Sequence, residues 1–164
     1  MMNYRVRRAR PSDAGAIARF VVEATHGRVN PDRGKVLDRL GSKGLWLVEG
    51  EEGIVGLAGW RTENLVARID DFLVHPPALR ETAGAALLEA IEEAAQELQC
   101  EVAMIYVPPG VAPGLRAFWE RQGYREGDLS RAPKPWQEAA EEALRQGRSV
   151  LFKQLREDLV MRPL

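Results

Sequence analysis

The residues from 80 to 85 have the types that bind an anion through the backbone. This segment, Arg-Glu-Thr-Ala-Gly-Ala, combines small side chains with one arginine and one hydroxyl group. It follows an apolar segment and precedes an amphipathic one, which predicts a turn from a strand into the first turn of a helix. The first N–H groups of a helix have no partners inside it, so they can bind a phosphate. The alternative is a strand, turn and helix without a ligand.

Two elements would hold this turn in place. The apolar run at 69–74 predicts a strand that ends at His75 and two prolines, because proline cannot continue a strand ladder. Over residues 83–98, apolar residues recur every three or four positions while glutamates occupy the other face, which predicts a helix. The expected anion site therefore lies where this strand leads into this helix.

The rest of the chain alternates between strand and helix patterns. Strands are expected near 4–10, 45–50, 54–60, 100–107 and 149–155, with the arginines of the first strand on a solvated face. Helices are expected near 11–24, 30–41, 112–122 and 133–147. A length of 164 residues suits one domain with a full-sized core. We therefore expect an α/β fold in a single domain that spans 1–164.

Composition argues against several function classes. The formal net charge is −1, whereas a general nucleic-acid binder needs a concentrated positive face. No apolar run approaches the roughly 18 residues of a membrane helix and the N-terminus has no signal-peptide core, so a cytoplasmic protein is expected. Cys100 is the one cysteine, and the two histidines, His26 and His75, lie far apart in the sequence. We therefore expect neither a disulfide within the chain nor a metal site.

Two segments resemble motifs of the GNAT acetyltransferase superfamily. The first aligns without a gap with V-H-P-x-x-R-G-x-G-x-G-x-A-L-L-x-A, so that V-H-P falls on 74–76 and A-L-L-x-A on 86–90. Gly84 retains the last motif glycine, whereas Thr82 replaces the glycine before it and Leu79 stands at the arginine position, next to Arg80. The second segment, 112–124, is similar to the family's N-P-x-A-x-x-L-Y-E-x-x-G-F.

The resemblance extends over about 4–155 and implies a fold and an activity. The fold would be an α/β GNAT fold, with helices around a central mixed and mostly antiparallel sheet whose parallel fourth and fifth strands splay apart. The activity would be direct transfer of an acetyl group from acetyl-CoA, the co-substrate, to an amine of a small molecule or peptide. The identity of the acceptor stays open, and the sequence allows a homodimer.

The resemblance also implies how acetyl-CoA binds. The backbone N–H groups of the turn would bind the pyrophosphate, with help from the Arg80 guanidinium or the Thr82 hydroxyl. The main chain of the preceding strand would bind pantetheine and the thioester carbonyl. The residues expected at the coenzyme are Phe72, Leu73, Val74, Arg80, Thr82, Ala83, Gly84 and Ala85.

Three residues are expected on the acceptor side. Strand alternation would place Asp70 on the side of Phe72 and Val74, which makes Asp70 the expected base, while Asp71 would point the other way. A solvated or salt-bridged carboxylate is the alternative for Asp70. In the family, the region joining the first two helices covers the acceptor, so Glu23 and His26 are candidate substrate contacts. A solvated glutamate and a helix-terminal histidine are the alternatives.

Two departures from the family fall where chemistry is expected. The family's asparagine falls on Ala112, and its tyrosine, often the acid that protonates the coenzyme thiolate, falls on Trp119. An indole N–H can donate a hydrogen bond but cannot release its proton near neutral pH. Trp119 is therefore expected to pack against the coenzyme arm. Tyr106 is the nearest substitute acid, with a core or cleft-lining tyrosine as the alternative.

Other readings stay open at this point. A GNAT-fold protein that binds acyl-CoA without turnover, or with weak activity, is favoured by Ala112, Trp119 and the altered turn. A plain α/β scaffold without a coenzyme is a third hypothesis. The additional helix near 133–147 either borders the acceptor pocket or covers an exposed sheet edge.

Overall fold

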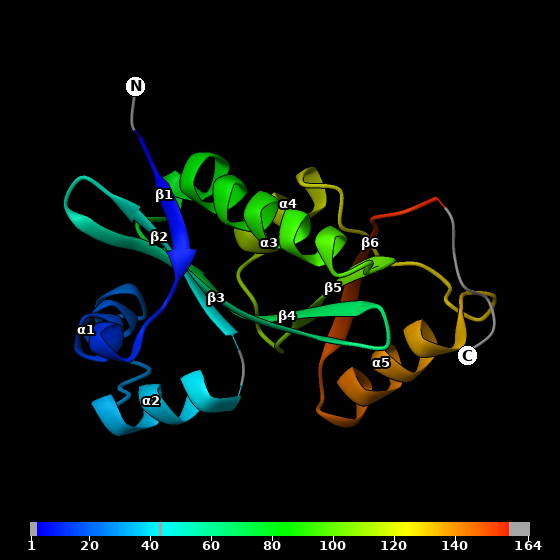
Figure 1. Ribbon diagram of the computed structural model, residues 1–164, viewed down its shortest axis with the longest axis horizontal. Coiled ribbons are helices and arrows are strands. Elements are labelled where there is room, and N and C mark those ends of the chain that lie inside the picture. Colours follow the sequence, from blue (N-terminus) through cyan, green and yellow to red (C-terminus); the bar gives the residue numbers. More distant parts are fainter. Residues whose placement is uncertain (1–2, 43, 158–164) are drawn as a thin grey trace. The chain divides into compact units, whose positions relative to one another are not determined.

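The computed structural model describes residues 3–42 and 44–157 (Figure 1). The strands are β1 (Arg5–Arg8), β2 (Gly44–Gly50), β3 (Gly53–Glu63), β4 (Val66–Val74), β5 (Val102–Val107) and β6 (Ser149–Gln154). The α-helices are α1 (Ala14–Ala24), α2 (Arg33–Ser42), α3 (Ala85–Glu97), α4 (Pro113–Arg121) and α5 (Lys134–Arg145). Short helical turns occupy η1 (Pro11–Asp13), η2 (Pro77–Leu79) and η3 (Arg80–Gly84).

The strands form a six-stranded sheet in the order β1-β2-β3-β4-β5-β6. The pairs β1–β2, β2–β3 and β5–β6 are antiparallel, whereas β4 and β5 are parallel. The parallel register joins Val66 to Val102 and ends at Ile69 and Ile105. The predicted α/β class, with a mixed and mostly antiparallel sheet and parallel fourth and fifth strands, is confirmed.

The chain divides into two compact units. The first unit contains the chain up to Trp60 together with Asp71–Ala90, and the second contains Arg61–Asp70 and the chain from Ile91 onward. Strands β3 and β4 therefore contribute residues to both units. The single domain expected from chain length stays a prediction.

The first unit has a core between its two N-terminal helices and its strands. Helix α1 contributes Ala14, Ile17 and Phe20, whose spacing of three residues places them on one face of the helix. They pack with Val36 of α2 and with three leucines of β2 and β3, which are Leu45, Leu47 and Leu57. Leu73 of β4 packs against this cluster, so the cluster also reaches the strand that leads into the predicted anion site.

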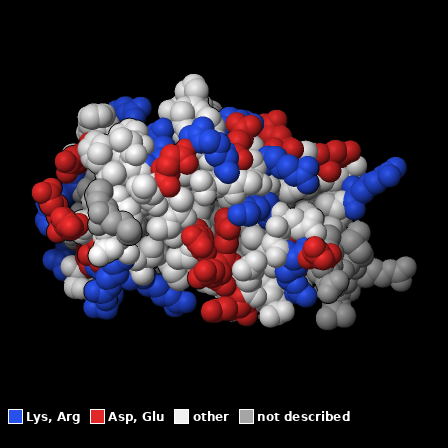
Figure 2. Space-filling view, turned by 90° about the horizontal axis from the view of Figure 1, so that it is seen from above, with Lys and Arg blue, Asp and Glu red and all other residues white. Residues whose placement is uncertain are grey.

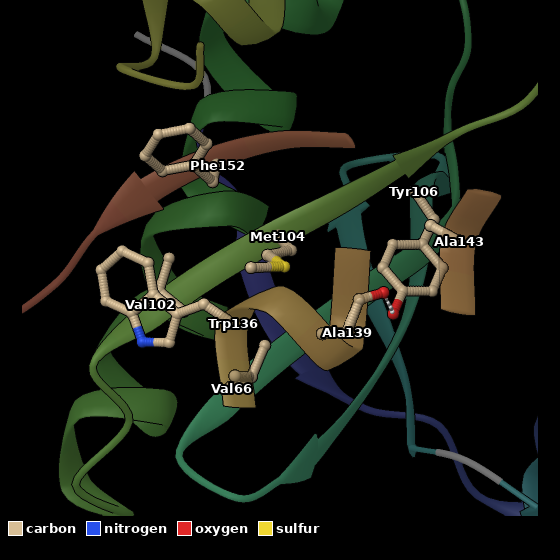
Figure 3. Close-up of a cluster of buried hydrophobic side chains, with 8 residues drawn as sticks. All are labelled: Val66, Val102, Met104, Tyr106, Trp136, Ala139, Ala143 and Phe152. Atoms are coloured by element: carbon tan, nitrogen blue, oxygen red, sulfur yellow. Dashed lines mark hydrogen bonds between the residues drawn. The ribbon is translucent and has the colours of Figure 1, made fainter. Parts of the chain in front are cut away.

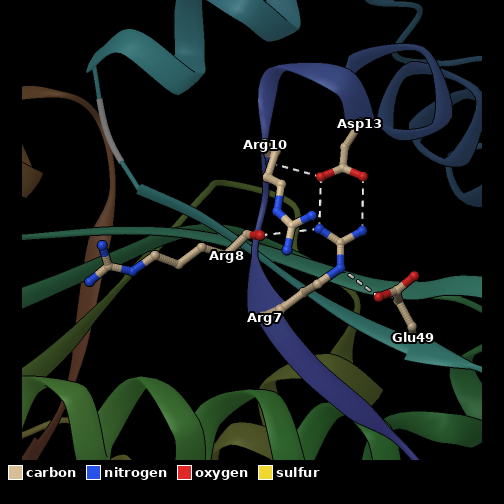
Figure 4. Close-up of polar contacts among 5 residues, drawn as sticks. All are labelled: Arg7, Arg8, Arg10, Asp13 and Glu49. Carbon is tan, nitrogen blue, oxygen red and sulfur yellow. Dashed lines mark hydrogen bonds and ion pairs between the residues drawn. The ribbon is translucent and has the colours of Figure 1, made fainter.

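An ionic network joins β1, β2 and the start of α1 (Figure 4). The Arg7 guanidinium donates two hydrogen bonds of 2.8 Å to the Asp13 carboxylate and one of 2.6 Å to Glu49. The Arg10 backbone N–H donates to Asp13 at 2.7 Å. These contacts lower the pKa of Asp13 to about 2, with the Arg7 hydrogen bonds as the largest cause. The prediction of a solvated face is therefore wrong for Arg7, whose side chain is only 18% exposed.

In the second unit, α5 packs on the sheet (Figure 3). Its inward residues Trp136, Ala139 and Ala143 belong to a buried cluster with five residues of the strands, which are Val66, Val102, Met104, Tyr106 and Phe152. The Trp136 indole N–H donates to the buried Glu101 carboxylate at 3.3 Å. The additional helix expected near 133–147 therefore covers a face of β4, β5 and β6.

The end of α4 in the second unit is fixed by a glycine and a tyrosine. Gly123 has a φ of 97°, a conformation that strains other residues and suits the end of a helix. Tyr124 is buried, and its hydroxyl donates to Glu92 of α3 at 2.9 Å. The Lys153 ammonium of β6 donates to the same carboxylate at 2.8 Å. The Gly-aromatic pair of the second motif thus ties α4 to α3 and β6.

The surface carries charges of both signs. Acidic and basic side chains are interspersed over the face shown in Figure 2, in keeping with a net charge of −1. None of the described helices is both long and apolar enough to cross a bilayer.

The Asp13 network predicts a pH-dependent contribution to stability. The pKa of Asp13 is 3.8 in a model peptide and about 2 in the folded protein. The stabilisation is therefore fully present above pH of about 4 and is lost as the pH falls toward about 2. We expect Asp13→Asn to lower the free energy of unfolding at pH 7 by about 1–2 kcal/mol. Urea unfolding at a series of pH values measures this.

Asp38→Asn is the matched control, because Asp38 is an exposed residue of α2. It should change the unfolding free energy by less than about 0.5 kcal/mol. The wild type should lose stability between about pH 4 and pH 2 more steeply than Asp13→Asn. If the unfolding free energies of the wild type and Asp13→Asn changed with pH in parallel, Asp13 would not be the source of this pH dependence.

Candidate functional site

The second half of β4 presents its backbone along one edge. The pairing with β5 ends at Ile69, five residues before the strand does. The His75 N–H donates to the Val55 carbonyl of β3 at 2.9 Å. Backbone groups alternate in direction along a strand, so the N–H and C=O groups of Phe72 and Val74 point to the edge opposite β3. This is the arrangement that the predicted main-chain contacts with a coenzyme arm require.

The side chains of this segment divide between the two faces of the sheet. Leu73 packs against the core cluster of α1 and α2. The ring of His75 lies edge-to-face with His26 at the end of α1, with 6.1 Å between ring centroids. Asp71 forms an ion pair with Arg39 of α2. Asp71, Leu73 and His75 therefore all contact α1, α2 or the residues that follow α1.

Asp71 has a left-handed backbone inside a strand, with a φ of 52°. Strict alternation of side chains requires extended backbone at every residue, and a left-handed residue interrupts it. Strand alternation therefore does not place Asp70 on the side of Phe72, because the left-handed Asp71 lies between them. Asp70 is half-buried, with its Oδ1 atom inside the protein. Its role as the base stays a prediction.

The predicted anion turn is itself helical. Residues Arg80–Gly84 form a single π-helical turn that leads directly into α3. The Ala85 N–H donates back to the carbonyls of Arg80 and Thr82. The N–H groups of Thr82 and Ala83 lie in this first turn, before the regular helix, whereas a π-helical turn over Arg80–Gly84 already engages the Gly84 N–H. Single π turns of this kind are frequent at functional sites.

The polar side chains of the turn are already in contact with the protein. The Thr82 hydroxyl donates to the Leu79 carbonyl at 3.3 Å and lies 3.0 Å from the Tyr4 hydroxyl. Since Thr82 has one hydroxyl proton, Tyr4 is the donor in that second bond. Arg80 is half-buried, and burial lowers the pKa of its guanidinium. Tyr4 was missed by sequence reasoning because it lies 78 positions from Thr82.

The acceptor-side candidates differ in their surroundings. His26 has a φ of 53° and lies edge-to-face with His75, so the fold brings the chain's two histidines together. The Glu23 side chain is exposed, and its backbone carbonyl accepts a hydrogen bond from the His26 N–H at 3.2 Å. Within residues 3–42 and 44–157, no three His, Cys, Asp or Glu side chains lie close enough together to hold a metal ion.

Three further candidates belong to the second unit. The Tyr106 hydroxyl donates to the Ala139 carbonyl of α5 at 2.7 Å, and burial raises the pKa of this tyrosine (Figure 3). This placement weighs against Tyr106 as a proton donor, because its proton is engaged inside the protein. Trp119 is a buried residue of α4 and is 2% exposed. Ala112 is the N-cap of α4, where an alanine offers no side-chain hydrogen bond to the helix.

Comparisons with solved structures show the fold. An acetyltransferase of the GNAT family from Staphylococcus aureus is 15% identical, with a TM-score of 0.69 over 94% of this chain and 100% of that chain. The PaiA N-acetyltransferase of Thermoplasma acidophilum, solved with coenzyme A, is 11% identical, with a TM-score of 0.67 over 93% and 99%. The ribosomal-protein-S18-alanine N-acetyltransferase of Escherichia coli is 14% identical, with a TM-score of 0.67 over 96% and 99%.

A comparison with curated proteins gives no match. The family model described as the acetyltransferase (GNAT) family matches residues 11–124. This range contains both motif segments and most of the elements described above, from η1 to the end of α4. It amounts to more than half of the chain, and the chain therefore belongs to the GNAT family of acetyltransferases.

Proposed function

We propose that the protein is an N-acetyltransferase that transfers an acetyl group directly from acetyl-CoA to an amine. One observation carries this proposal: the backbone edge at Phe72 and Val74 is followed, after a short connection, by the helical turn Arg80–Gly84 that begins α3. An extended pantetheine arm needs the first feature and a pyrophosphate needs the second. The PaiA structure, which the chain resembles in fold, is a complex with coenzyme A.

Acetyl-CoA would bind by strand-like pairing followed by anion binding. The main chain of Phe72, Leu73 and Val74 would hold pantetheine and the thioester carbonyl, as the resemblance implies. The N–H groups at the start of the turn, those of Thr82 and Ala83, would donate to the pyrophosphate, where the partial positive charge of the helix end favours an anion. The Ala85 N–H, also expected at the pyrophosphate, is already bonded to carbonyls of the turn. The Thr82 hydroxyl would have to turn away from the Leu79 carbonyl to donate to the same phosphates, which would release the Tyr4 hydroxyl as a further donor.

Direct transfer is favoured over an acyl-enzyme intermediate. The obvious covalent nucleophile would be a thiolate, and Cys100 is the one cysteine of the chain. Cys100 is 1% exposed, and burial raises the pKa of its thiol to about 11. It therefore carries almost no thiolate at neutral pH. The amine would attack the thioester carbon, the C–S bond would break, and the thiolate of coenzyme A would leave.

Asp70 is the proposed base for the acceptor ammonium, and Asp71 is the second carboxylate in the strand. The Asp71 carboxylate is paired with Arg39 of α2, so it would have to leave that guanidinium to accept a proton. Glu23 and His26, at the end of α1, are proposed to contact the acceptor.

A protein that binds acyl-CoA without efficient turnover is the second candidate function. Trp119 and Ala112 stand where the family has a tyrosine and an asparagine, and the Tyr106 hydroxyl is engaged by α5. These features would leave the thiolate without a dedicated proton donor. Calorimetric binding of acetyl-CoA, followed by an assay of thiol release with a panel of amines, separates the two functions. Failure to bind acetyl-CoA would reject both.

Gly84 tests the coenzyme site. We expect Gly84→Val to weaken acetyl-CoA binding at least tenfold, about 1.4 kcal/mol, because a branched side chain would keep the phosphates from the turn. Gly84→Ala should have a smaller effect in the same direction. Gly41→Val is the control, because Gly41 lies in a helix where an added Cβ meets open space. Calorimetry on proteins with intact thermal transitions measures this, and unchanged affinity in folded Gly84→Val would exclude the site.

Substitution of Asp70 and of Asp71 tests which carboxylate acts as the base. We expect Asp70→Asn to lower turnover by roughly 10²-fold while acetyl-CoA affinity stays within about twofold. Asp71→Asn should lower kcat far less, because it removes a paired carboxylate at a position where asparagine tolerates the left-handed backbone. Steady-state kinetics with the best amine of the panel measures both. A larger loss of kcat in Asp71→Asn would reverse the assignment.

Substitution of Trp119 tests whether the protein lacks a proton donor for the coenzyme thiolate. We expect Trp119→Tyr to raise the rate of transfer by about tenfold, since it restores an ionisable hydroxyl to a step whose thiolate can also leave unaided. Trp119→Phe is the matched control, because it changes the packed volume similarly without supplying a proton. Single-turnover release of the thiol measures the step. If the rate of thiol release rose equally in both variants, the gain would come from packing. Tyrosine would then not act as a proton donor at this position.

A further inference from the structure

Two hydroxyl groups meet at the helical turn that precedes α3. The Tyr4 hydroxyl, which comes just before β1, lies 3.0 Å from the Thr82 hydroxyl of η3, although 78 positions separate the two residues. Thr82 donates its own proton to the Leu79 carbonyl at 3.3 Å, so Tyr4 donates to Thr82. The two hydroxyls therefore form a chain of hydrogen bonds that ends inside the turn.

The Tyr4 ring is held in place by the end of β2. Tyr4 is half-buried, and a Cβ atom added at Gly50, the last residue of β2, would lie 3.8 Å from the Cε1 atom of the ring. Tyr4, Gly50 and Thr82 all belong to the first unit. A tyrosine has only two side-chain torsions, so a ring that packs in this way aims its hydroxyl with little loss of entropy. The N-terminal segment thus supplies a fixed donor to the turn.

A cation at the start of the turn is a second, independent observation. Arg80 is the first residue of η3 and is half-buried. Burial lowers the pKa of its guanidinium, and no carboxylate of the described residues offsets that effect. A positive charge that has lost part of its water is unfavourable unless an anion compensates it. The arginine therefore indicates that a negatively charged ligand binds at this turn.

The pyrophosphate of acetyl-CoA, the co-substrate, suits this group of donors because both of its phosphates are negatively charged. Thr82 stands where the family motif has a glycine, so its side chain adds a hydroxyl that the motif lacks. When Thr82 turns its proton from the Leu79 carbonyl to a phosphate, Tyr4 becomes able to donate to the phosphate as well. Two hydrogen bonds between neutral groups are then exchanged for two to a charged group, which are roughly twice as strong.

We infer that Tyr4 is a coenzyme-binding residue, whose hydroxyl donates to the pyrophosphate of acetyl-CoA beside Thr82 and Arg80. This inference deepens the proposed function and rests on it. The segment that precedes β1 becomes part of the coenzyme site, although it lies far from both motifs in the sequence. Ligands that contain the pyrophosphate depend on the Tyr4 hydroxyl, and ligands without a phosphate do not.

Calorimetry on the full chain tests this inference. Tyr4→Phe removes the hydroxyl and keeps the ring, so we expect it to weaken the binding of acetyl-CoA by about fivefold or more. Dephospho-CoA, which lacks only the 3′-phosphate, should show the same loss. Thr82→Val keeps the branched shape of the side chain and should also weaken both ligands. Pantetheine, which has no phosphate, should bind the wild type and Tyr4→Phe equally in titrations followed by NMR.

Tyr124→Phe is the matched control. It removes a tyrosine hydroxyl that donates to Glu92 in the second unit, so it should lower the thermal stability. The affinity for acetyl-CoA should nevertheless stay within about twofold of the wild type, because Tyr124 lies outside the proposed coenzyme site. An equal loss of affinity in Tyr124→Phe and Tyr4→Phe would attribute the effect to stability and overturn the inference.

Phosphorus NMR of bound coenzyme A gives a readout that a purely structural role of Tyr4 would not move. Tyr4→Phe should shift the pyrophosphate signals and leave the 3′-phosphate signal in place. Unchanged acetyl-CoA affinity in Tyr4→Phe, or an equal loss of affinity for pantetheine, would overturn the inference while the proposed function stands. A wild type that does not bind acetyl-CoA would reject the proposed function, and this inference with it.

Discussion

Hydrogen bonding along β4 is the constraint on which the rest of the site depends. A strand inside a sheet must satisfy its backbone groups on both edges, yet the register of β4 with β5 covers only the stretch from Val66 to Ile69. Beyond Ile69, β3 still pairs with one edge of β4, as the hydrogen bond from the His75 N–H to the Val55 carbonyl shows. The backbone groups of Phe72 and Val74 point to the other edge. The left-handed residue Asp71 stands where this change occurs. A strand that loses one of its two partners in this way is suited to accept an extended ligand as its next neighbour.

Much of the fold could be predicted because apolar periodicity is a local property. Local sequence determines the helix that carries Ile17 and Phe20. It also determines the apolar strand that ends before His75. The contacts of the site come from long-range packing and have no such signal. His26 meets His75, and Tyr4 meets Thr82, only after the sheet has formed. The φ of Asp71 was also unpredictable, since glycine rather than aspartate is the usual mark of a left-handed residue.

Arginines have a structural role in this chain that composition alone conceals. Arg7 was expected in solvent and is instead shared between Asp13 and Glu49. In the second unit, Arg68 of β4 is buried and pairs with Glu142 of α5, which also contacts Arg61 at 3.2 Å. A guanidinium can satisfy two carboxylates with a fixed, forked geometry, which a lysine cannot do. Such pairs set the positions of α1 and α5 more specifically than apolar contact does, because a buried charge tolerates few alternative arrangements.

The burial of Cys100 has a consequence for how the protein can be observed. A thiol with a pKa of about 11 reacts slowly with alkylating agents while it stays inside the protein. Its reaction would then report the moments when the segment between α3 and β5 opens to solvent. The chain thus carries a single, naturally placed probe of local unfolding, and its labelling rate with and without bound coenzyme would measure how far ligand binding stabilises the second unit.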